Sequence, residues 1–522
     1  GSDALALDAA ALEQARHDVH ESGGAPIAVL SPPDSAALGR AVAAITGHGV
    51  AVVPRGGGLS YTGGYVLPQG GAVLIDLSRM NRVVAIDADS MTVTVEAGAT
   101  WKTIDQALAQ RGLRLPFFGT FSGAGATVGG GPSHGALFFG SARDGSAADI
   151  VLSMDVVLAD GRVMRTGQGA LKAARHPVFR GLGPDLTGLF LHDGGAFGIK
   201  SRATLRVIQR PRHTGHASFA FAALDDAVRA LCAIQRKGLV EDAYIMDPGA
   251  TDHLDIDPAT ALRSARSVAP SAGGALAAGR APSVRGRAGR GPIPKGRFSL
   301  HLVAPGNTAG TVSHDLACCQ AIATGHGGCE VAPTIPMVAR ADPFPGLNGV
   351  LGPGGGRWAA LNAKVALGEA TGLVAAFEAM IAGMAEEMAE AGVRVTRLAS
   401  ALASPSFSFE AVFHWRDAWL PLHRTAPDAA YRATLQEPAP DPAAFALVNR
   451  LRAMTVALFR DLGAASNQIG RTYPFLTALR EEPAELLLAI KSALDPRNLM
   501  NPGVLEFPHV PHSTPEQDHK DD

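Results

Sequence analysis

The chain has 522 residues, with 46 Lys or Arg against 48 Asp or Glu, and 47% of its residues are hydrophobic. This length corresponds to roughly three domain-sized units. The formal net charge of −2 gives no basic field for nucleic acid, and the apolar content excludes a wholly disordered chain. The unusual component is glycine, with 61 residues and no Gly-X-Y repeat. We therefore expect glycine in turns and where the backbone approaches a ligand.

The cysteines and the hydrophobic runs narrow the class of protein further. Cys232, Cys318, Cys319 and Cys329 are too few for a disulfide framework, and we expect them to be buried, reduced thiols. Neither Cys-x-x-Cys nor His-Glu-x-x-His occurs, so no metal site is predicted. No signal peptide is recognised, and no apolar run reaches the roughly 18 residues of a membrane span. These features predict a cytoplasmic protein without nucleic-acid or membrane partners.

Short β-type runs and helical patterns share the first 210 residues. The runs are rich in Val and Ile, and most are bounded by Gly or Pro. We expect strands at 27–30, 50–53, 73–77, 92–96, 150–158, 163–164 and 203–208, and helices at 35–48 and 100–111. Asp160-Gly161 between two of these runs predicts a hairpin. The order favours an α+β region over strict βαβ alternation.

From about residue 212 the pattern of short β-type runs gives way to longer predicted helices. We expect helices at 224–238, 368–392, 442–462 and 483–494, and an alternating strand at 407–413. The Gly/Arg-rich stretch 273–297 is interpreted as a surface loop, because no aromatic residues alternate with its charges as in a nucleic-acid arm. The tail 509–522 is polar, and we expect it to be frayed.

Two glycine clusters are the strongest local features. The loop at 54–64, Pro-Arg-Gly-Gly-Gly-Leu-Ser-Tyr-Thr-Gly-Gly, follows a predicted strand, and successive backbone N–H groups in such a loop bind phosphate. The second cluster spans 119–135 and contains Gly131-Pro-Ser133-His-Gly135, which fits a Gly-x-Ser-x-Gly pattern. A hydrolase is not favoured, because that pattern needs a strand before it. Two such loops predict one long ligand, such as a dinucleotide, lying across both.

A series of segments in one order resembles the flavin domain of the vanillyl-alcohol oxidase/p-cresol methylhydroxylase superfamily. The segments include both glycine clusters, Val73-Leu-Ile-Asp-Leu77, Val95-Glu-Ala-Gly98 and Asp495-Pro-Arg-Asn-Leu-Met-Asn-Pro-Gly503. The resemblance covers about 25–210 and 455–507. It implies an α+β fold with a two-subdomain FAD-binding domain and an α+β substrate-binding cap domain. The expected division is an N-terminal arm at 1–24, the FAD-binding domain at 25–211, the cap at 212–454, a returning C-terminal segment at 455–508 and a tail at 509–522.

The resemblance also implies which residues hold FAD. The pyrophosphate would lie on Arg55, Gly56, Gly57, Gly58, Leu59, Ser60, Gly63 and Gly64. The rest of the cofactor would contact Gly125, Gly129, Gly130, Ser133, His134, Gly198, Ile199 and Asn501. Covalent members of the family carry a linking histidine either where this chain has Leu59 or in a cap stretch that here contains Arg357 and no histidine. We therefore expect non-covalent FAD, and interpret His414 as a strand residue and His423 as a surface residue.

For the chemistry, the resemblance points to residues near the C-terminus. Arg471 aligns with an arginine that binds a substrate phenolate, and Tyr473 is a candidate for the missing partner tyrosine. Asp144 lies near the position of an acid beside flavin N5, and Tyr61 or His134 is a candidate general base. For each of these residues a purely structural role stays open.

The resulting prediction is an FAD-dependent oxidoreductase that oxidises an aromatic alcohol, phenolic or lignin-derived, by hydride transfer to flavin N5. A 2-hydroxy acid such as D-lactate or glycolate is the alternative substrate. A non-catalytic flavin-binding protein is the alternative of another class. The expected partners are a small-molecule substrate and an electron acceptor, oxygen or another; whether the chain forms a homodimer stays open.

Overall fold

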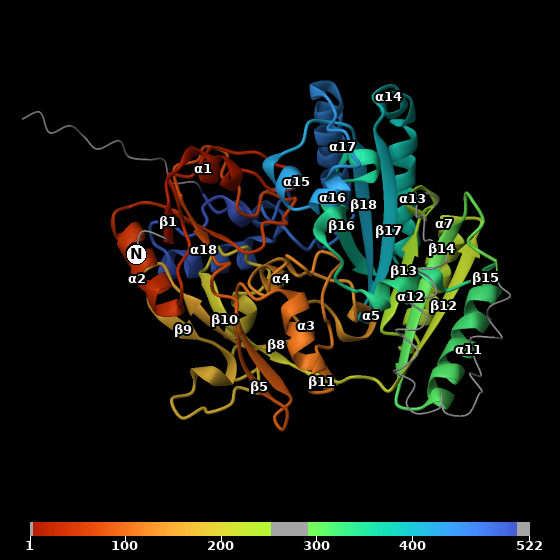
Figure 1. Ribbon diagram of the computed structural model, residues 1–522, viewed down its shortest axis with the longest axis horizontal. Helices are drawn as coiled ribbons and strands as arrows, with labels where there is room; N and C mark the ends of the chain where they lie inside the picture. The colour runs from red at the N-terminus through yellow and green to blue at the C-terminus, as the bar shows by residue number, and fades with distance from the viewer. Residues whose placement is uncertain (1–3, 252–290, 404, 509–522) are drawn as a thin grey trace, which may run out of the picture.

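The computed structural model describes residues 4–251, 291–403 and 405–508, which form two bodies side by side (Figure 1). The first, here called the N-terminal module, contains residues 4–211. The second, the cap, contains the described residues of 212–461, and its last helix ends at Asp461. The chain after 461, blue in Figure 1, runs back from the cap to the N-terminal module. The site therefore has walls from segments far apart in the sequence.

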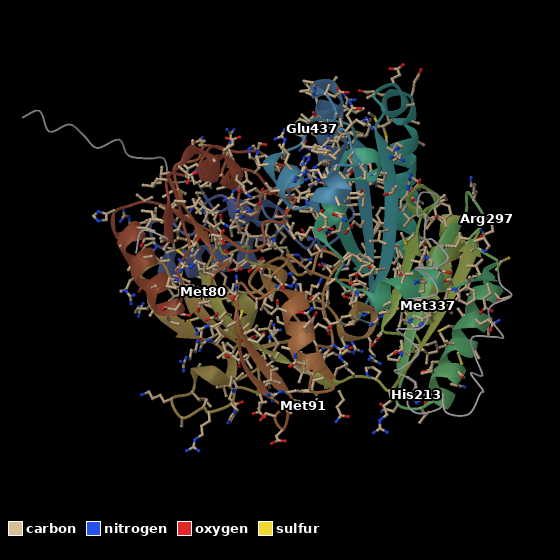
Figure 2. All side chains as sticks on the ribbon, in the orientation of Figure 1. Met80, Met91, His213, Arg297, Met337 and Glu437 are labelled. Carbon is tan, nitrogen blue, oxygen red and sulfur yellow. The ribbon has the colours of Figure 1, made fainter. Side chains whose placement is uncertain are left out.

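The N-terminal module contains two sheets. A small sheet has the order β1-β2-β4-β3, in which the last three strands are parallel. Its strands are β1 (Leu5–Ala6), β2 (Ala28–Leu30), β3 (Val52–Arg55) and β4 (Val73–Asp76). Helix α2 (Ser35–Gly47) connects β2 to β3 and is capped by the Asp34 side chain, which accepts from the Ala37 N–H at 2.8 Å. Met80, labelled in Figure 2, is fully buried in the core of this region.

The second sheet is antiparallel, with the order β5-β6-β10-β8-β9. Its strands are β5 (Val83–Asp87), β6 (Thr92–Glu96), β8 (Val151–Val157), β9 (Val163–Arg165) and β10 (Ile199–Arg206). Helix α3 (Trp101–Ala109) packs Trp101, Ile104 and Leu108 into its core. β8 and β9 form the hairpin predicted at Asp160-Gly161. A short pair, β7 (Leu113–Arg114) and β11 (Ile208–Gln209), ends the module.

The cap is built on a seven-stranded antiparallel sheet with the order β15-β12-β14-β13-β17-β18-β16. Its strands are β12 (His213–Phe221), β13 (Asp242–Met246), β14 (Phe298–Gly306), β15 (Cys329–Val331), β16 (Arg357–Ala366), β17 (Arg394–Leu402) and β18 (Ser406–Trp415). Its longer helices are α7 (Leu224–Gln235), α11 (Ala309–Gly325), α12 (Thr334–Ala341), α13 (Ala370–Ala382), α14 (Ala385–Glu390) and α17 (Pro442–Asp461). Helices α7, α11, α13 and α17 contribute to one hydrophobic core with the sheet.

Most predicted elements of the cap are present, and two expectations are wrong. The helix expected over 368–392 is two helices, because α13 ends at Ala382 and α14 begins at Ala385. His423 is fully buried rather than on the surface, and its Nδ1 accepts from the Leu420 N–H at 3.0 Å. The tail 509–522 and most of the 273–297 stretch lie outside the described residues.

The C-terminal segment is anchored to the N-terminal module. Helix α18 (Glu481–Leu494) precedes a turn in which Met500 forms a parallel bridge with Val52 of β3. The buried Lys491 ammonium donates to the Ala196 carbonyl at 2.6 Å and to Asp495 at 2.7 Å. No helix in the described part of the chain is long and apolar enough to span a bilayer.

The free thiols differ from the sequence expectation. Cys232 and Cys319 are buried, but Cys318 is partly exposed and Cys329 is exposed. The expectation of buried thiols is therefore wrong for Cys329, which opens the edge strand β15. An edge strand has a neighbour on one side only, so a side chain at its end meets solvent.

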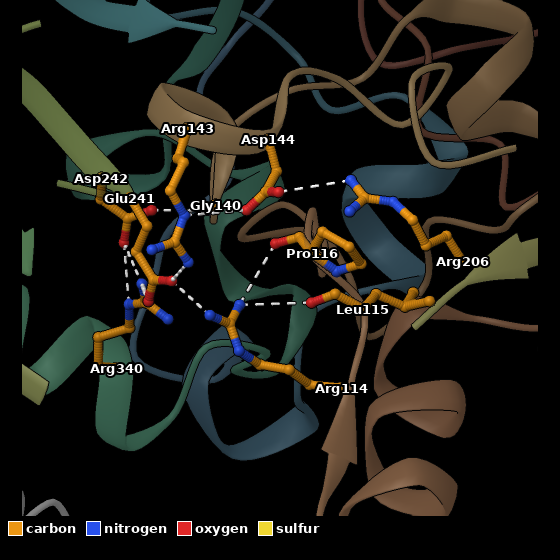
Figure 3. A network of polar contacts seen from close by, with 10 residues as sticks. All are labelled: Arg114, Leu115, Pro116, Gly140, Arg143, Asp144, Arg206, Glu241, Asp242 and Arg340. Carbon is orange, nitrogen blue, oxygen red and sulfur yellow. Dashed lines mark hydrogen bonds and ion pairs between the residues drawn. The ribbon is translucent and has the colours of Figure 1, made fainter. Parts of the chain in front are cut away.

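A buried network of charges joins the two bodies (Figure 3). Arg114 of β7 and Arg143 of α5 (Ser141–Asp144) both donate to the Glu241 carboxylate, from the side of the N-terminal module. From the cap, Arg340 of α12 donates to Glu241 at 2.5 Å and to Asp242 at 2.9 Å. Burial alone would raise the pKa of Glu241, but the three guanidinium groups outweigh it and hold the pKa at about 2. The network therefore fixes the cap against the N-terminal module with Glu241 ionised.

Candidate functional site

A cavity of about 680 Å³ lies between the N-terminal module and the cap. Its walls on the module side are the two glycine loops and the segment around Gly194–Ile199. On the other side its walls are β17, β18 and the loop 345–353 of the cap, with Asn467 and Gln468 from the C-terminal segment. The cavity contacts both glycine loops, as the two-loop pattern predicts for one long ligand such as a dinucleotide.

The first glycine loop follows β3 and presents unpaired backbone amides. None of the amides of residues 56–61 donates a hydrogen bond to another described residue. A run of N–H groups of this kind is a nest for anionic oxygens. The loop is pressed against the second cluster: a Cβ on Gly57 would lie 1.9 Å from the Gly125 carbonyl oxygen. Glycine is required here by that close approach.

Distant residues hold the far end of this loop. The buried Asp18 carboxylate accepts from the Gly63 N–H at 2.9 Å, and the Arg471 guanidinium donates to the Gly63 carbonyl at 2.6 Å. The Asn501 amide donates to the Gly64 carbonyl at 2.9 Å and accepts from Arg471 at 2.6 Å. The shape of the loop therefore depends on side chains from both ends of the chain.

The second glycine cluster forms the short helix α4 (Gly130–His134) at the cavity wall. Gly131 packs against Trp101, whose ring would lie 2.4 Å from an added Cβ. The Ser133 hydroxyl donates to the Gly129 carbonyl at 2.7 Å, so it is used within the helix. Burial, together with the nearby Lys200 ammonium, lowers the pKa of His134 to about 4, so its imidazole is neutral at pH 7. Its Nδ1 has no hydrogen-bond partner among the described residues.

The cap presents one face of two strands to the cavity. Alternate residues point inward, as the two-residue period of a strand requires. The alternating residues that line the cavity are Arg394, Thr396, Leu398 and Ser400 on β17, and Ser408, Glu410, Val412 and His414 on β18; Arg397 of β17 also reaches the lining. The residues between those on β18, Phe407, Phe409, Ala411 and Phe413, are fully buried in the core on the opposite face.

Glu410 is the single carboxylic side chain among the residues that line this cavity. It makes no hydrogen bond or ion pair with any described residue, and burial raises its pKa to about 7. Tyr61 and Tyr473 are close enough for a charged Glu410 to raise their pKa values as well. A carboxyl group in this state can accept or donate a proton near neutral pH.

Tyr61 lies at the same part of the cavity and has a defined hydrogen-bond role. The Gln468 amide donates to its hydroxyl oxygen at 2.8 Å, which leaves the tyrosine O–H free to donate. Its ring packs against Trp358 with 5.5 Å between centroids. Burial raises the pKa of Tyr61 well above its usual value, so the hydroxyl is protonated at neutral pH.

The cations of the cavity are already paired or lie at its rim. Three Lys or Arg side chains line it: Lys200, Arg394 and Arg397. Lys200 forms a buried ion pair with Asp193, and Arg397 donates two hydrogen bonds to Glu378. Arg394 is exposed. The cap side of the cavity therefore has no buried, unpaired cation among the described residues.

Comparison with known proteins decides what the glycine loops bind. Residues 26–167 match the FAD binding domain family, and residues 474–505 match the C-terminal domain of FAD linked oxidases. These two segments, one in the N-terminal module and one in the C-terminal segment, are similar to the domains of FAD-linked oxidases, and the first is the one that contains both glycine loops. A solved structure of p-cresol methylhydroxylase with substrate bound has the same fold, with a TM-score of 0.71 at 18% identity, over 97% of this chain and 95% of that one.

Two curated relatives of this flavoprotein act on 2-hydroxy acids, by their names. The chain is 31% identical over 224 residues to a mitochondrial D-lactate dehydrogenase (cytochrome) of Arabidopsis thaliana, covering 43% of this chain and 38% of that one. It is 31% identical over 186 residues to glycolate oxidase subunit GlcD of Bacillus subtilis, covering 36% of this chain and 38% of that one. The matched region thus spans about two fifths of these relatives.

The residues present fit FAD. The unpaired backbone amides of residues 56–61 suit the pyrophosphate of FAD. The glycines of α4 have no side chains that would occupy the cavity, so the rest of the cofactor can lie against them. Of the residues predicted to bind FAD, those that line the cavity are Gly56, Gly57, Gly58, Leu59, Ser60, Gly64, Gly129, Gly130, Ser133, His134, Gly198 and Ile199.

Four residues predicted to contact FAD do not line the cavity: Arg55, Gly63, Gly125 and Asn501. The Arg55 side chain is 3.9 Å from the Asp76 carboxylate and lies over the Tyr65 ring. Asn501 is fully buried, and its amide spans the Gly64 and Gly194 carbonyls. Arg55 and Asn501 therefore support the glycine loops, and contact of these four residues with FAD stays a prediction.

Among the residues predicted to act in catalysis, Tyr61 and His134 line the cavity, and Arg471, Tyr473 and Asp144 do not. The Arg471 guanidinium donates to the Gly63 and Pro502 carbonyls and to Asn501, so it supports the first glycine loop, and its substrate-binding role stays a prediction. The Tyr473 hydroxyl is buried and accepts from the Asn362 N–H at 2.7 Å. Asp144 faces Arg143 and Arg206 outside the cavity.

Glu410 is not among the site residues predicted from the sequence. Its signal is present in the strand expected at 407–413, where three phenylalanines and Ala411 alternate with Ser408, Glu410 and Val412. One face of that strand is therefore apolar and the other is mixed, and an acid on the mixed face of a cap strand is a candidate for the site.

Proposed function

We propose that this FAD-dependent oxidoreductase oxidises an aromatic alcohol, phenolic or lignin-derived, with Glu410 as the proton acceptor. The observation that carries the proposal is the chemistry of the cap wall. Trp358, Leu347, Val350 and Val412 give it an apolar surface, and Glu410 is its one carboxyl group. A flat apolar substrate with a single hydroxyl matches that surface.

Three side chains at the cavity, Glu410, Tyr61 and Trp358, have roles in the proposed reaction. FAD, when bound, supplies the hydride acceptor at N5. The Glu410 carboxylate takes the proton from the substrate hydroxyl as the carbon is oxidised, and its raised pKa of about 7 suits proton transfer near neutral pH. The Tyr61 O–H donates to the substrate oxygen, because Gln468 already occupies the acceptor side of that hydroxyl. Trp358 packs against Tyr61 and keeps its ring in place.

A 2-hydroxy acid is the second candidate, because the curated relatives named above are a D-lactate dehydrogenase and a glycolate oxidase. Such a substrate carries a carboxylate, which enzymes bind with an unpaired Arg or Lys. The cations available here are paired or at the rim, and an ionised Glu410 would repel an anion. The cavity therefore favours the uncharged aromatic substrate.

The test is anaerobic mixing of the FAD-loaded protein with substituted benzyl alcohols and, separately, with D-lactate and glycolate. Loss of flavin absorbance near roughly 450 nm reports hydride transfer. We expect reduction by an aromatic alcohol, with a rate that rises through about pH 7 as Glu410 loses its proton. Reduction by D-lactate or glycolate alone would replace this proposal with the second candidate.

Glu410→Gln tests the assigned base. We expect the reduction rate to fall by roughly 10²-fold or more and its dependence on pH near 7 to disappear. Glu386→Gln, on the exposed face of α14, is the matched control and should leave both unchanged. A Glu410→Gln enzyme that keeps the rate and the pH profile would exclude Glu410 as the base.

A further inference from the structure

A protruding segment of the N-terminal module has an unusual combination of side chains. Residues 162–186 contain five Lys or Arg and one Asp, a formal charge of +4. In Figure 1 this segment begins at β9 and includes the ochre loop that projects at the lower left. None of its residues lines the cavity, so the proposed reaction does not account for it.

The segment concentrates exposed hydrophobic side chains. Six of the fourteen exposed large hydrophobic residues in the described part of the chain fall within it. They are Val163, Leu171, Val178, Phe179, Leu182 and Leu186. Phe179 is 61% exposed and Leu171 is 49% exposed. Single exposed hydrophobics are ordinary, but such a group on one projecting segment marks an interaction surface.

The segment has a fixed shape. The Gln168 N–H donates to the Phe179 carbonyl at 2.9 Å, and the Gln168 side chain accepts from the Val178 N–H at 3.0 Å. These bonds close a loop over 168–179. Within the loop, the His176 imidazole lies 3.3 Å from the Asp87 carboxylate of β5. Leu171 and Phe179 are therefore presented by a closed loop rather than by a chain end.

The unpaired positive charges of the loop indicate an anionic partner. Arg162, Arg165 and Arg180 are paired with Asp160, Asp155 and Asp185. Lys172 and Arg175 have no ion pair or hydrogen bond with any described residue. These two free cations lie on the same loop as Leu171 and Phe179. Exposed apolar side chains next to free cations fit the interface of an anionic bilayer, where the former enter the acyl boundary and the latter meet lipid phosphates.

We propose that the loop 168–179 docks this flavoprotein on the surface of an anionic lipid bilayer, through Leu171 and Phe179 together with Lys172 and Arg175. The contact is peripheral and does not need a membrane-spanning helix. It differs from the sequence expectation of no membrane partner, which was based on signal peptides and spanning segments alone. A second copy of the chain is a weaker match, because the same loop on both copies would place like charges together.

Vesicle flotation with the full-length, FAD-loaded protein tests the proposal. The probes are vesicles of phosphatidylcholine alone and of phosphatidylcholine with an equal part of phosphatidylglycerol. We expect binding to the anionic vesicles that weakens as salt is added. Lys172→Glu with Arg175→Glu should lower the partition coefficient by about tenfold or more, because each cation near such a surface contributes a several-fold factor.

A second variant separates the apolar contribution from the charge. Leu171→Ser with Phe179→Ser should also reduce binding severalfold and should leave the salt dependence in place. Matched controls are Leu486→Ser on α18, which is as exposed as Phe179, and Arg236→Glu with Lys237→Glu at the end of α7. The controls should bind as the unaltered protein does. Flavin reduction by substrate should be unchanged in all of these variants, since none touches the cavity.

Three results would overturn the proposal. The first is no binding to anionic vesicles above that to phosphatidylcholine alone. The second is equal loss of binding in the loop variants and the controls. The third is concentration-dependent self-association without lipid that the loop variants abolish, which would assign the surface to contact between copies of the chain.

Discussion

Glu241→Gln is the sharpest test of how the cap is held on the N-terminal module. The substitution keeps the size of the side chain and removes the charge that faces Arg114, Arg143 and Arg340. Glu241 is about 1% exposed, so water does not replace the lost partner. Breaking a buried ion pair by removing one member leaves unpaired charge inside the protein and costs about 3–5 kcal/mol.

The pKa of Glu241 gives a second route to the magnitude. A carboxyl group with a pKa of about 2 in the folded protein and about 4.3 when unfolded contributes about 3 kcal/mol at neutral pH. That contribution is complete above the unfolded pKa and is lost as the pH falls toward 2. We therefore expect the unfolding free energy of the unaltered protein to fall more steeply below about pH 4.5 than that of Glu241→Gln.

The assay is urea unfolding of the FAD-loaded protein at neutral and acidic pH, followed by fluorescence. Glu387→Gln is the control, because its ion pair with Arg450 is half-exposed and worth at most about 1 kcal/mol. Loss of less than about 1 kcal/mol at neutral pH on changing Glu241, or the same acid dependence in both proteins, would refute the reasoning.

The remaining predictions concern the cofactor. Gly57→Ala should lower the FAD content of the purified protein severalfold, measured by absorbance, because its Cβ would meet the Gly125 carbonyl; Gly372→Ala on α13, where space is open, should not. Arg471→Ala should lower the melting temperature and the FAD content, because the guanidinium supports the first glycine loop. The KM of the FAD-loaded fraction should be unchanged. A raised KM would show that Arg471 binds substrate. Acid precipitation should release yellow FAD into the supernatant, because Leu59 takes the place of a linking histidine; colour in the pellet would contradict this.

The flavin fold could be predicted because its signature is local. A glycine loop after a strand is readable from a dozen consecutive residues, and both clusters lie at the cavity. The roles of Arg471 and Tyr473 could not be predicted in the same way. A motif gives the position of a residue in the chain, but its partners, here the Gly63 carbonyl and the Asn362 amide, are set by packing between distant segments.

Glu410 shows the opposite case. Its strand was expected from the alternation of apolar with mixed positions over 407–413. Which face of the strand meets the cavity depends on the order of the cap sheet and on the helices that cover the other face. The two-residue period of the strand places Ser408, Glu410, Val412 and His414 on one face, and these four line the cavity. Only the packing of the cap against the N-terminal module selects this set.

The supports of the first glycine loop have a consequence for biosynthesis. Its far end is held by Asp18 from one side of the sequence and by Asn501 from the other, and the Asn501 contact with Gly64 spans 437 positions. The strand and loop leave the ribosome long before Asn501 does, so the nest lacks its final support while most of the chain is being made. Closing so long a separation is a late event in folding. Flavin uptake is then coupled to the arrival of the C-terminal segment, and a chain truncated before it would emerge colourless.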